Sequence, residues 1–155
     1  MCETMKTTVR IMIGRDVPEL IALGYDLDAK TLQKQLHRRN MLNYVAEIDG
    51  RVAGHMAYIL GRRCFVLERF FVAPGARRRG VGTMMWRKLH GKLGRDPYNR
   101  DIVVCMVPDT ALDVQLFLKA SGFRATGVVD DYYRMVFRVP IDTEAGSSEP
   151  QMQRW

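Results

Sequence analysis

The chain has 155 residues, of which 47% are hydrophobic and 26% charged, an ordinary composition for one soluble domain. No apolar run approaches the roughly twenty residues that cross a bilayer, and the first ten residues lack the apolar core of a signal peptide. We therefore expect a cytoplasmic protein without a membrane span. The net charge of +7 indicates a polyanionic partner, although solvated surface charge explains the excess equally well.

The cysteines and histidines give no sign of metal binding. Cys2, Cys64 and Cys105 are odd in number and widely spaced, and no C-x-x-C or zinc-type Cys/His pairing occurs. The three histidines are scattered singly. We expect no metal, reduced thiols, and buried packing roles for the two cysteines that lie in apolar strands.

The N-terminal third predicts a strand and two helices. Apolar residues alternate over Thr7–Ile13, as in a strand with one buried face. Asp16 and Glu19 have the spacing of a capping box, which predicts a helix with Asp16 as its N-cap that runs to about Gly24. A second helix is expected from about Asp28.

Three antiparallel strands follow. Asn43–Ile48 and Val52–Leu60 are rich in strand-forming residues and are joined at Asp49–Gly50, a strong hairpin signal. Gly54 interrupts the second of these strands and predicts a bulge or a bend. Cys64–Val72 is almost wholly apolar and predicts a third, largely buried strand.

A basic glycine loop separates the third strand from an amphipathic helix. The loop is Arg77–Gly82, and apolar residues then recur every four positions at Met85, Leu89 and Leu93. Glycines let the backbone approach an anion closely, and the first N–H groups of a helix have no partner within it. We therefore expect an anion at Gly80–Thr83.

The kind of anion can be narrowed by elimination. The sequence contains no Gly-Lys-Ser/Thr of a nucleoside-triphosphatase loop, and the third glycine of a dinucleotide fingerprint is missing. The pattern that remains is R-x-x-G-x-G, formed by Arg77, Gly80 and Gly82. The alternative is a basic turn that only caps the helix.

The C-terminal part of the sequence predicts a strand, a helix and a final pair of strands. A buried strand at Asp101–Val107 precedes a helix with Asp109 or Thr110 as its N-cap, which ends at Ser121-Gly122-Phe123. A final pair of strands is expected at Phe123–Val129 and Tyr132–Val139. Residues 140–155 have too few apolar residues for a core and are expected to form a flexible tail.

Together these features resemble the GNAT N-acetyltransferase superfamily over about residues 7–139. Besides the loop, the matching motifs are V-A-E-x-D-G-x-V-x-G at Val45–Gly54 and the segment Gln115–Phe123. The resemblance is closest to the branch that acetylates the N-terminal alanine of a ribosomal protein. It implies an α/β (α+β) GNAT fold in one domain at 1–139, with a mixed, mostly antiparallel sheet of about seven strands and about four helices.

The resemblance also implies acetyl-CoA as cosubstrate, without a metal. In this superfamily acetyl-CoA lies between the strand that ends at Val72 and the strand that ends at Val107. The residues expected to bind it are Phe70, Phe71, Val72, Arg77, Arg78, Arg79, Gly80, Val81, Gly82 and Thr83.

The acid and base of the ribosomal branch are not present. Its base glutamate, its asparagine and its tyrosine fall at Met106, Ala111 and Phe117. These three positions are apolar, so neither the standard acid and base nor the alanine-terminus substrate carries over.

Other residues are candidates for these catalytic roles. Glu68 is the best candidate base, and two-residue alternation predicts that it is buried on the face of Phe70 and Val72. An ion pair with a basic neighbour is an equally good interpretation of Glu68. Tyr132 and Tyr133 are candidate proton donors, although packing accounts for each of them as well.

The resulting functional expectation is an acetyl-CoA-dependent N-acetyltransferase acting on a primary amine. The amine would be a protein or peptide N-terminus, a lysine or a small amine. The alternative is an acyl-CoA-binding module without turnover that acts as a sensor. The sequence has no helix-turn-helix, zinc or RNA-binding signature, so nucleic acid is not expected except through ribosomal partners.

Overall fold

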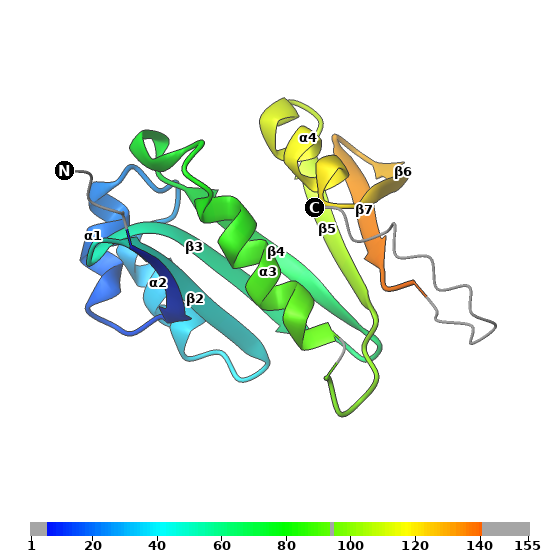
Figure 1. Ribbon diagram of the computed structural model, residues 1–155, viewed down its shortest axis with the longest axis horizontal. Helices are drawn as coiled ribbons and strands as arrows, with labels where there is room; N and C mark the ends of the chain where they lie inside the picture. Colours follow the sequence, from blue (N-terminus) through cyan, green and yellow to red (C-terminus); the bar gives the residue numbers. More distant parts are fainter. Residues whose placement is uncertain (1–5, 94, 141–155) are drawn as a thin grey trace.

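The computed structural model describes residues 6–93 and 95–140. Within these residues the chain forms, in order, β1 (Thr7–Ile11), α1 (Asp16–Ala22), α2 (Ala29–Leu36), β2 (Met41–Ile48), β3 (Arg51–Leu60), β4 (Cys64–Val72), the 3-10 turn η1 (Pro74–Ala76), α3 (Val81–Leu93), β5 (Ile102–Pro108), α4 (Leu112–Ala120), β6 (Arg124–Val129) and β7 (Tyr132–Arg138) (Figure 1). The predicted order of strands and helices is confirmed. The tail expected at 140–155 lies, apart from Pro140, outside the described residues.

The strands form one mixed sheet in the spatial order β1-β2-β3-β4-β5-β7-β6. Neighbouring strands are antiparallel except β4 and β5, which are parallel. A parallel neighbour requires a crossover, and α3 supplies it between these two strands. The mixed, mostly antiparallel sheet expected from the sequence is thereby confirmed.

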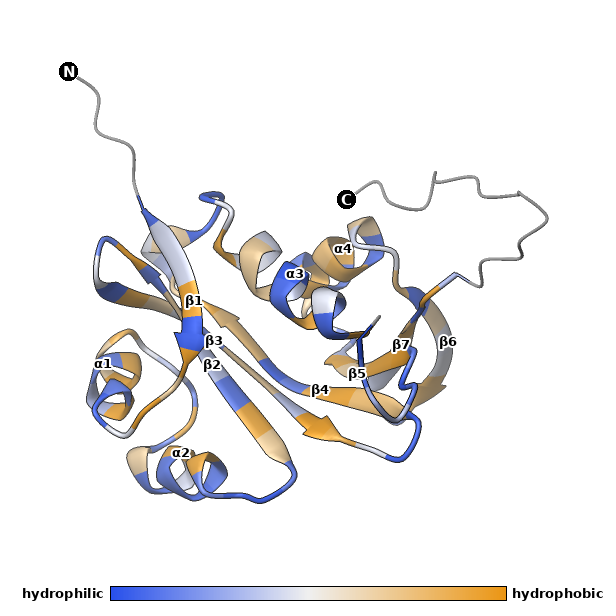
Figure 2. Ribbon diagram, turned by 60° about the horizontal axis from the view of Figure 1, so that its bottom comes forward, coloured by the Kyte–Doolittle hydropathy of each residue, from blue (hydrophilic) through white to orange (hydrophobic). Residues whose placement is uncertain are grey.

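Helices cover both faces of the sheet, and each face has its own core. Figure 2 shows α3 and α4 on one side of the sheet and α1 and α2 on the other. On the first side, Met85, Trp86 and Leu89 of α3 pack in the larger apolar cluster. On the second side, Leu20 of α1 and Leu32 of α2 belong to a smaller cluster.

β3 carries a one-residue bulge beside Gly54. Ala46 pairs with Gly54 and Glu47 with Val52, so the intervening Ala53 is the extra residue. A Cβ atom at Gly54 would lie 2.8 Å from the carbonyl oxygen of Phe71. The predicted irregularity is confirmed, and glycine is required here because β4 approaches closely.

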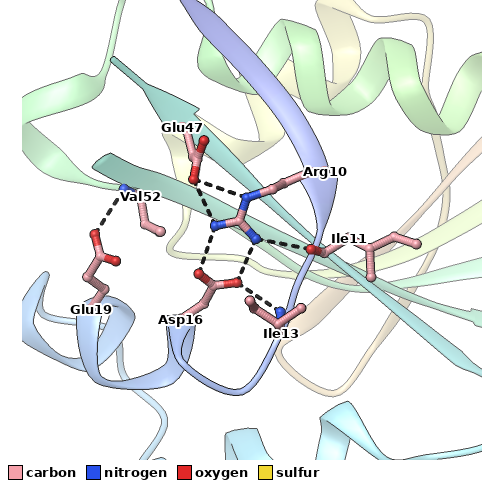
Figure 3. A network of polar contacts seen from close by, with 7 residues as sticks. All are labelled: Arg10, Ile11, Ile13, Asp16, Glu19, Glu47 and Val52. Atoms are coloured by element: carbon pink, nitrogen blue, oxygen red, sulfur yellow. Dashed lines mark hydrogen bonds and ion pairs between the residues drawn. The ribbon is translucent and has the colours of Figure 1, made fainter. Parts of the chain in front are cut away.

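A buried ionic network joins β1, α1 and β2 (Figure 3). Arg10 donates to both carboxylate oxygens of Asp16 at 2.8 and 2.9 Å and to Glu47 at 2.8 and 3.0 Å. The backbone N–H of Ile13 also donates to Asp16, at 2.8 Å. The Asp16 side chain is 1% exposed. A bidentate arginine and a backbone donor therefore hold this carboxylate inside the fold.

This network overturns the predicted capping box. The N-cap of α1 is Arg15, and the helix begins at Asp16 itself. The Asp16 carboxylate is committed to Arg10, and Glu19 accepts from the backbone N–H of Val52 at 3.2 Å. Partners outside the helix therefore occupy both carboxylates, which do not form the capping box that their spacing predicts.

Other predicted boundaries are shifted by one or two residues. β1 ends at Ile11 instead of Ile13, and α4 follows Ala111, which has no side-chain cap, in place of Asp109 or Thr110. The second helix begins next to Asp28, near the expected start, and Asp28 caps it by accepting from Thr31 N–H at 2.7 Å. Among the described residues, no helix has the length and apolar character needed to cross a membrane.

Candidate functional site

The site lies where β4 and β5 separate. The two strands pair only from Cys64 with Ile102 to Leu67 with Cys105. Beyond these pairs β4 continues to Val72 and β5 to Pro108, but the two strands no longer pair with each other. Figure 1 shows them diverging toward the end where α4 begins. The main chain of β4 beyond Leu67 is therefore not covered by β5.

A bulge at Glu68 marks the point of separation. On the β3 side, Tyr58 pairs with Leu67 and Ala57 with Arg69, which leaves Glu68 as the extra residue. A bulge bends its strand and breaks the alternation of faces. Leu67 and Phe70, although three residues apart, both pack in the core cluster against α3.

The bulge corrects two expectations about Glu68. Regular alternation does not hold across it, so it does not place Glu68 on the face of Phe70 and Val72. Glu68 is also exposed, so the burial expected to make it a stronger base is absent. No salt bridge found in the described part of the chain involves Glu68, so the alternative of a structural ion pair gains no support either.

A cavity of about 310 Å³ occupies the gap between the strands, and we call it the strand cavity. Gly24, Tyr25 and Asp26 of the loop between α1 and α2 line one side of it. Its other lining residues come from β4, β5 and α4: Leu67, Glu68, Arg69, Phe70, Phe71, Cys105, Met106, Val107, Pro108 and Val114. Asp26 and Arg69 form an ion pair at 3.2 Å beside it.

Cys105 is a buried thiol in this cavity. It is 7% exposed, and burial, followed by the negative charge of Glu68, raises its pKa to about 12. The Glu68 carboxylate therefore acts electrostatically on the thiol. A thiol with this pKa stays protonated at neutral pH, so Cys105 is a poor nucleophile.

The basic glycine loop leads into α3 with two left-handed residues. Arg78 has a φ of 66° and Gly80 a φ of 81°. Met84 N–H donates to the carbonyl oxygen of Gly80, so the N–H groups that precede it are at the open start of the helix. The helix dipole adds partial positive charge at this point.

A second cavity of about 510 Å³ lies between this loop, the end of β4 and the start of α4, and we call it the loop cavity. It is lined by Phe70, Phe71, Val72, Ala76, Arg77, Arg78, Gly80, Val81, Gly82, Thr83, Asp113, Val114 and Phe117. The two cavities share Phe70, Phe71 and Val114. An elongated ligand can therefore extend from the loop toward the gap between β4 and β5.

The predicted anion-binding residues meet in the loop cavity, except Arg79. Arg79 lines a separate hollow near Ala22 and Asp49. The lining also includes Asp113, which pairs with Arg77 at 3.6 Å, and Val114. Neither residue carries a sequence signal, because only the packing of α4 brings it to the loop.

The predicted proton donors do not line either cavity. Tyr132 is 43% exposed and lies opposite Pro108 in the pairing of β7 with β5. Tyr133 lies opposite Val107 and packs against the larger core cluster. The structure thus does not bring these tyrosines together with Glu68, and their catalytic role stays a prediction.

Three positions that are polar in the ribosomal branch are occupied by apolar residues around the cavities. Met106 lines the strand cavity, and Ala111 precedes α4. Phe117 stacks on Phe70 with ring centroids 5.2 Å apart in the loop cavity. The two phenyl rings form part of the wall of the loop cavity, and neither ring has a hydroxyl group that could donate a proton.

A buried polar chain supports the wall of the strand cavity. Tyr25 stacks on Phe71 at 4.5 Å and its hydroxyl lies 2.7 Å from Nδ1 of His55. Nε2 of His55 lies 3.0 Å from Oδ1 of Asn43, whose amide donates to the Gln35 carbonyl at 3.2 Å. Because the amide oxygen must accept, His55 carries its proton on Nε2 and accepts from Tyr25 on Nδ1.

His55 is fully buried, and burial lowers its pKa to about 4. It is therefore neutral at physiological pH, which the Tyr25 hydrogen bond requires. Burial also raises the pKa of Tyr25, so its hydroxyl stays a donor. A histidine within the otherwise apolar strand Val52–Leu60 was the sequence signal for this chain, but the sequence offers no indication of its partners.

Comparison with known proteins identifies the family. The family model described as an acetyltransferase (GNAT) domain matches residues 22–134. No curated protein sequence matches this chain.

Solved structures share the fold at low sequence identity. PaiA N-acetyltransferase of Thermoplasma acidophilum, solved in complex with coenzyme A, has a TM-score of 0.74 at 12% identity, over 86% of this chain and 99% of that one. The ribosomal-protein-S18-alanine N-acetyltransferase of Escherichia coli has a TM-score of 0.73 at 14% identity, over 88% and 96%. A spermidine N-acetyltransferase chimera that includes the Vibrio cholerae enzyme has a TM-score of 0.68 at 17% identity, over 85% and 95%.

The similarity to proteins with different acceptors does not single out one branch. The shared fold agrees with the separation of β4 from β5 and with the glycine loop, which are the features expected of the superfamily. The family model covers most of the chain, including β2 to β6 and the first residues of β7. The chain belongs to the GNAT acetyltransferase family.

Proposed function

We propose that this protein transfers an acetyl group from acetyl-CoA to a primary amine by direct attack of the amine on the thioester. The observation that carries the proposal is the continuity of the two cavities at Phe70, Phe71 and Val114. One cavity ends at an anion-binding loop, and the other opens beside the α1–α2 loop. A thioester held where they meet is accessible to an amine from the opposite side.

The loop cavity would hold coenzyme A. Backbone N–H groups between Arg78 and Thr83 would bind the pyrophosphate at the positive end of α3, while Arg77 adds positive charge nearby. Because β5 does not pair with β4 beyond Leu67, the main chain of Phe70–Val72 can bind the pantetheine and polarise the acetyl carbonyl. Arg79 would contribute long-range charge only.

Direct transfer is favoured over an acyl-enzyme because the cavity offers no active nucleophile. Cys105 is the thiol that lines the strand cavity, and its raised pKa keeps it protonated. Holding the thioester and the amine together supplies much of the rate by itself. An exposed Glu68 would act as base through water or hold the incoming ammonium ion, and Tyr132 or Tyr133 stays the predicted donor to the thiolate.

The acceptor would be a protein or peptide N-terminus, a lysine or a small amine. An α-amine, with a pKa of about 7.7 to 8.0, is partly neutral near pH 7, whereas lysine at about 10.4 needs more help from a base. The apolar Met106, Ala111 and Phe117 favour the more easily deprotonated α-amine. The two-residue link between β6 and β7 leaves the acceptor side without a long covering loop.

The second candidate function is an acyl-CoA sensor without turnover. It is favoured by the stacked Phe117 and Phe70, which place an apolar ring in the loop cavity where the resemblance predicts a tyrosine. This function predicts tight acetyl-CoA binding with no acceptor-dependent release of thiol.

One pair of measurements distinguishes the two functions. Isothermal titration measures acetyl-CoA binding, and thiol release is followed with mixed peptide and polyamine acceptors. A Cβ atom at Gly82 would lie 3.4 Å from the Phe70 ring and 3.6 Å from the Phe117 ring, so Gly82→Trp fills the loop cavity. Gly91→Trp is the matched control, because among the described residues only the flexible Arg95 guanidinium lies within 4 Å of that Cβ position.

We expect binding that is lost in Gly82→Trp and kept in Gly91→Trp, with thiol release only when an acceptor is present. Binding without release from any acceptor would support the sensor. Wild-type protein that binds no acetyl-CoA would refute both functions.

A further inference from the structure

A third cavity, of about 470 Å³, lies at the opposite end of α3 from the glycine loop, and we call it the lysine cavity. Its floor includes Tyr58 of β3 and Phe65 of β4, and Lys88 and Lys92 of α3 stand at its side. Lys92 is eleven residues beyond Val81, which places it about 16 Å along the helix axis from the loop. Coenzyme A bound at the loop by its pyrophosphate would leave this cavity to another ligand.

The lysine cavity has an excess of positive charge. Lys88, Lys92, Arg95 and Arg100 line it together with one carboxylate, Asp96. That carboxylate is already used, since it accepts from the Arg100 guanidinium at 3.0 Å and from the backbone N–H groups of Tyr98 and Arg100 at 3.0 and 2.8 Å. Three positive charges therefore face the cavity without a carboxylate to balance them.

The two lysines carry most of this unbalanced charge. Their ammonium groups lie 5.7 and 5.5 Å from the centroid of the same Tyr44 ring. No ion pair found within residues 6–93 and 95–140 involves Lys88 or Lys92. Two like charges held beside one ring repel each other, and an anion between them relieves that repulsion.

A buried hydroxyl in the cavity floor also lacks a partner. Tyr58 is 0% exposed, and its hydroxyl makes no hydrogen bond within the part of the chain that the structure describes. Buried hydroxyl groups in folded proteins usually have a partner. Burial, followed by the neighbouring Tyr44 side chain, raises the pKa of Tyr58, so this hydroxyl stays protonated and can act as a hydrogen-bond donor.

The remaining walls combine aromatic and aliphatic side chains with the guanidinium of Arg100. The Arg100 guanidinium lies 5.8 Å from the Phe65 ring and 5.1 Å from the Tyr98 ring. Leu42 and Leu60 add aliphatic surface. These walls favour a ligand with a planar apolar body, and the cavity volume is in the range of small-molecule sites.

We propose that the lysine cavity is a second binding site, separate from the glycine loop, for a small phosphate monoester with a planar apolar body. Lys88 and Lys92 neutralise the phosphate, and the Tyr58 hydroxyl donates to one of its oxygens. The planar body packs against the exposed Tyr98 ring and the side chains of Leu42 and Leu60. This site does not depend on acetyl transfer.

The probe for this site is phenyl phosphate, titrated by calorimetry with coenzyme A saturating and again without it. Inorganic phosphate and phenol separate the contributions of the anion and the ring. We expect phenyl phosphate to bind one site in both conditions, inorganic phosphate to bind at least tenfold more weakly, and phenol not to bind. Competition by coenzyme A for the same site would overturn the proposal.

Three variants assign the contacts. The double variant Lys88→Gln/Lys92→Gln removes the two charges and is expected to weaken binding at least tenfold. Its matched control is Arg87→Gln/Lys119→Gln, which removes two exposed charges from α3 and α4 that do not line the cavity. Tyr58→Phe removes only the hydroxyl and is expected to weaken binding severalfold, and the thermal midpoint of the variant shows whether the neighbouring Tyr44 contact is also lost.

The proposal fails if wild type and the double glutamine variant bind phenyl phosphate equally, because the lysines then only offset the carbonyl end of α3. It also fails if the control variant loses as much affinity, which would indicate unspecific charge. A mixed-sequence RNA oligonucleotide that binds this face, and that phenyl phosphate does not displace, would overturn the proposal in favour of a nucleic-acid surface.

Discussion

Acidification from pH 7 to pH 5 should destabilise this fold through His55. The side chain is 0% exposed, accepts from Tyr25 on one ring nitrogen and donates to Asn43 from the other. Burial lowers its pKa from the ordinary 6.5 to about 4. Between these two pH values His55 binds a proton in the unfolded chain but stays neutral in the folded protein. The free energy of unfolding therefore decreases as the pH falls through this window.

The size of the effect follows from the pKa difference. Each pH unit within the window costs about 1.4 kcal/mol, so the free energy of unfolding should fall by roughly 2 kcal/mol between pH 7 and pH 5. The ionic network at Asp16 does not contribute in this range. Although burial raises the pKa of Asp16, its bonds to Arg10 and Ile13 outweigh burial and lower it, so its stabilisation is lost only at more acidic pH.

The assay is urea unfolding at pH 7 and pH 5, followed by circular dichroism. His55→Gln cannot titrate in this window and should lose most of the pH dependence, whereas the exposed His37→Gln should keep it. Burial also lowers the pKa of His90, but this residue is present in every variant and cancels in the comparison. An equal loss of stability in wild type and His55→Gln would refute the assignment to His55.

Three further predictions concern other structural features. Asp16→Ala should cost about 3 kcal/mol in urea unfolding at pH 7, because it removes a buried carboxylate that accepts from Arg10 and from Ile13 N–H, whereas Asp26→Ala, in an exposed pair, should cost at most about 1 kcal/mol. Similar costs for both would show that the first network is not special. Gly54→Ala should cost about 1–3 kcal/mol, since the new Cβ would meet a β4 carbonyl at 2.8 Å, whereas Gly75→Ala should be nearly neutral in the same assay. Gly80→Ala forces alanine into a φ of 81°, costs about 1–2 kcal/mol and should weaken acetyl-CoA binding in calorimetry; unchanged affinity would contradict the role given to the loop.

The local pattern of the sequence determined most of the fold. The hairpin at Asp49–Gly50 and the start of the second helix near Asp28 were predictable, because neighbouring residues fix them. The glycine loop was predictable for the same reason, since the motif and the following helix are contiguous. The resemblance to a known superfamily then supplied the overall fold and an expected place for the cosubstrate.

Only the tertiary structure decided the surroundings of Glu68 and the partners of Asp16. A bulge interrupts the alternation of faces without any reliable mark in the sequence, so alternation could not place Glu68, which is exposed instead of buried. Asp16 has the spacing of a cap, but Arg10 of a neighbouring strand competes for it with two hydrogen bonds. Likewise, Tyr25 and His55 meet only because the α1–α2 loop folds onto β3. Short-range propensity is encoded along the chain, whereas competition between partners is settled only when distant segments come into contact.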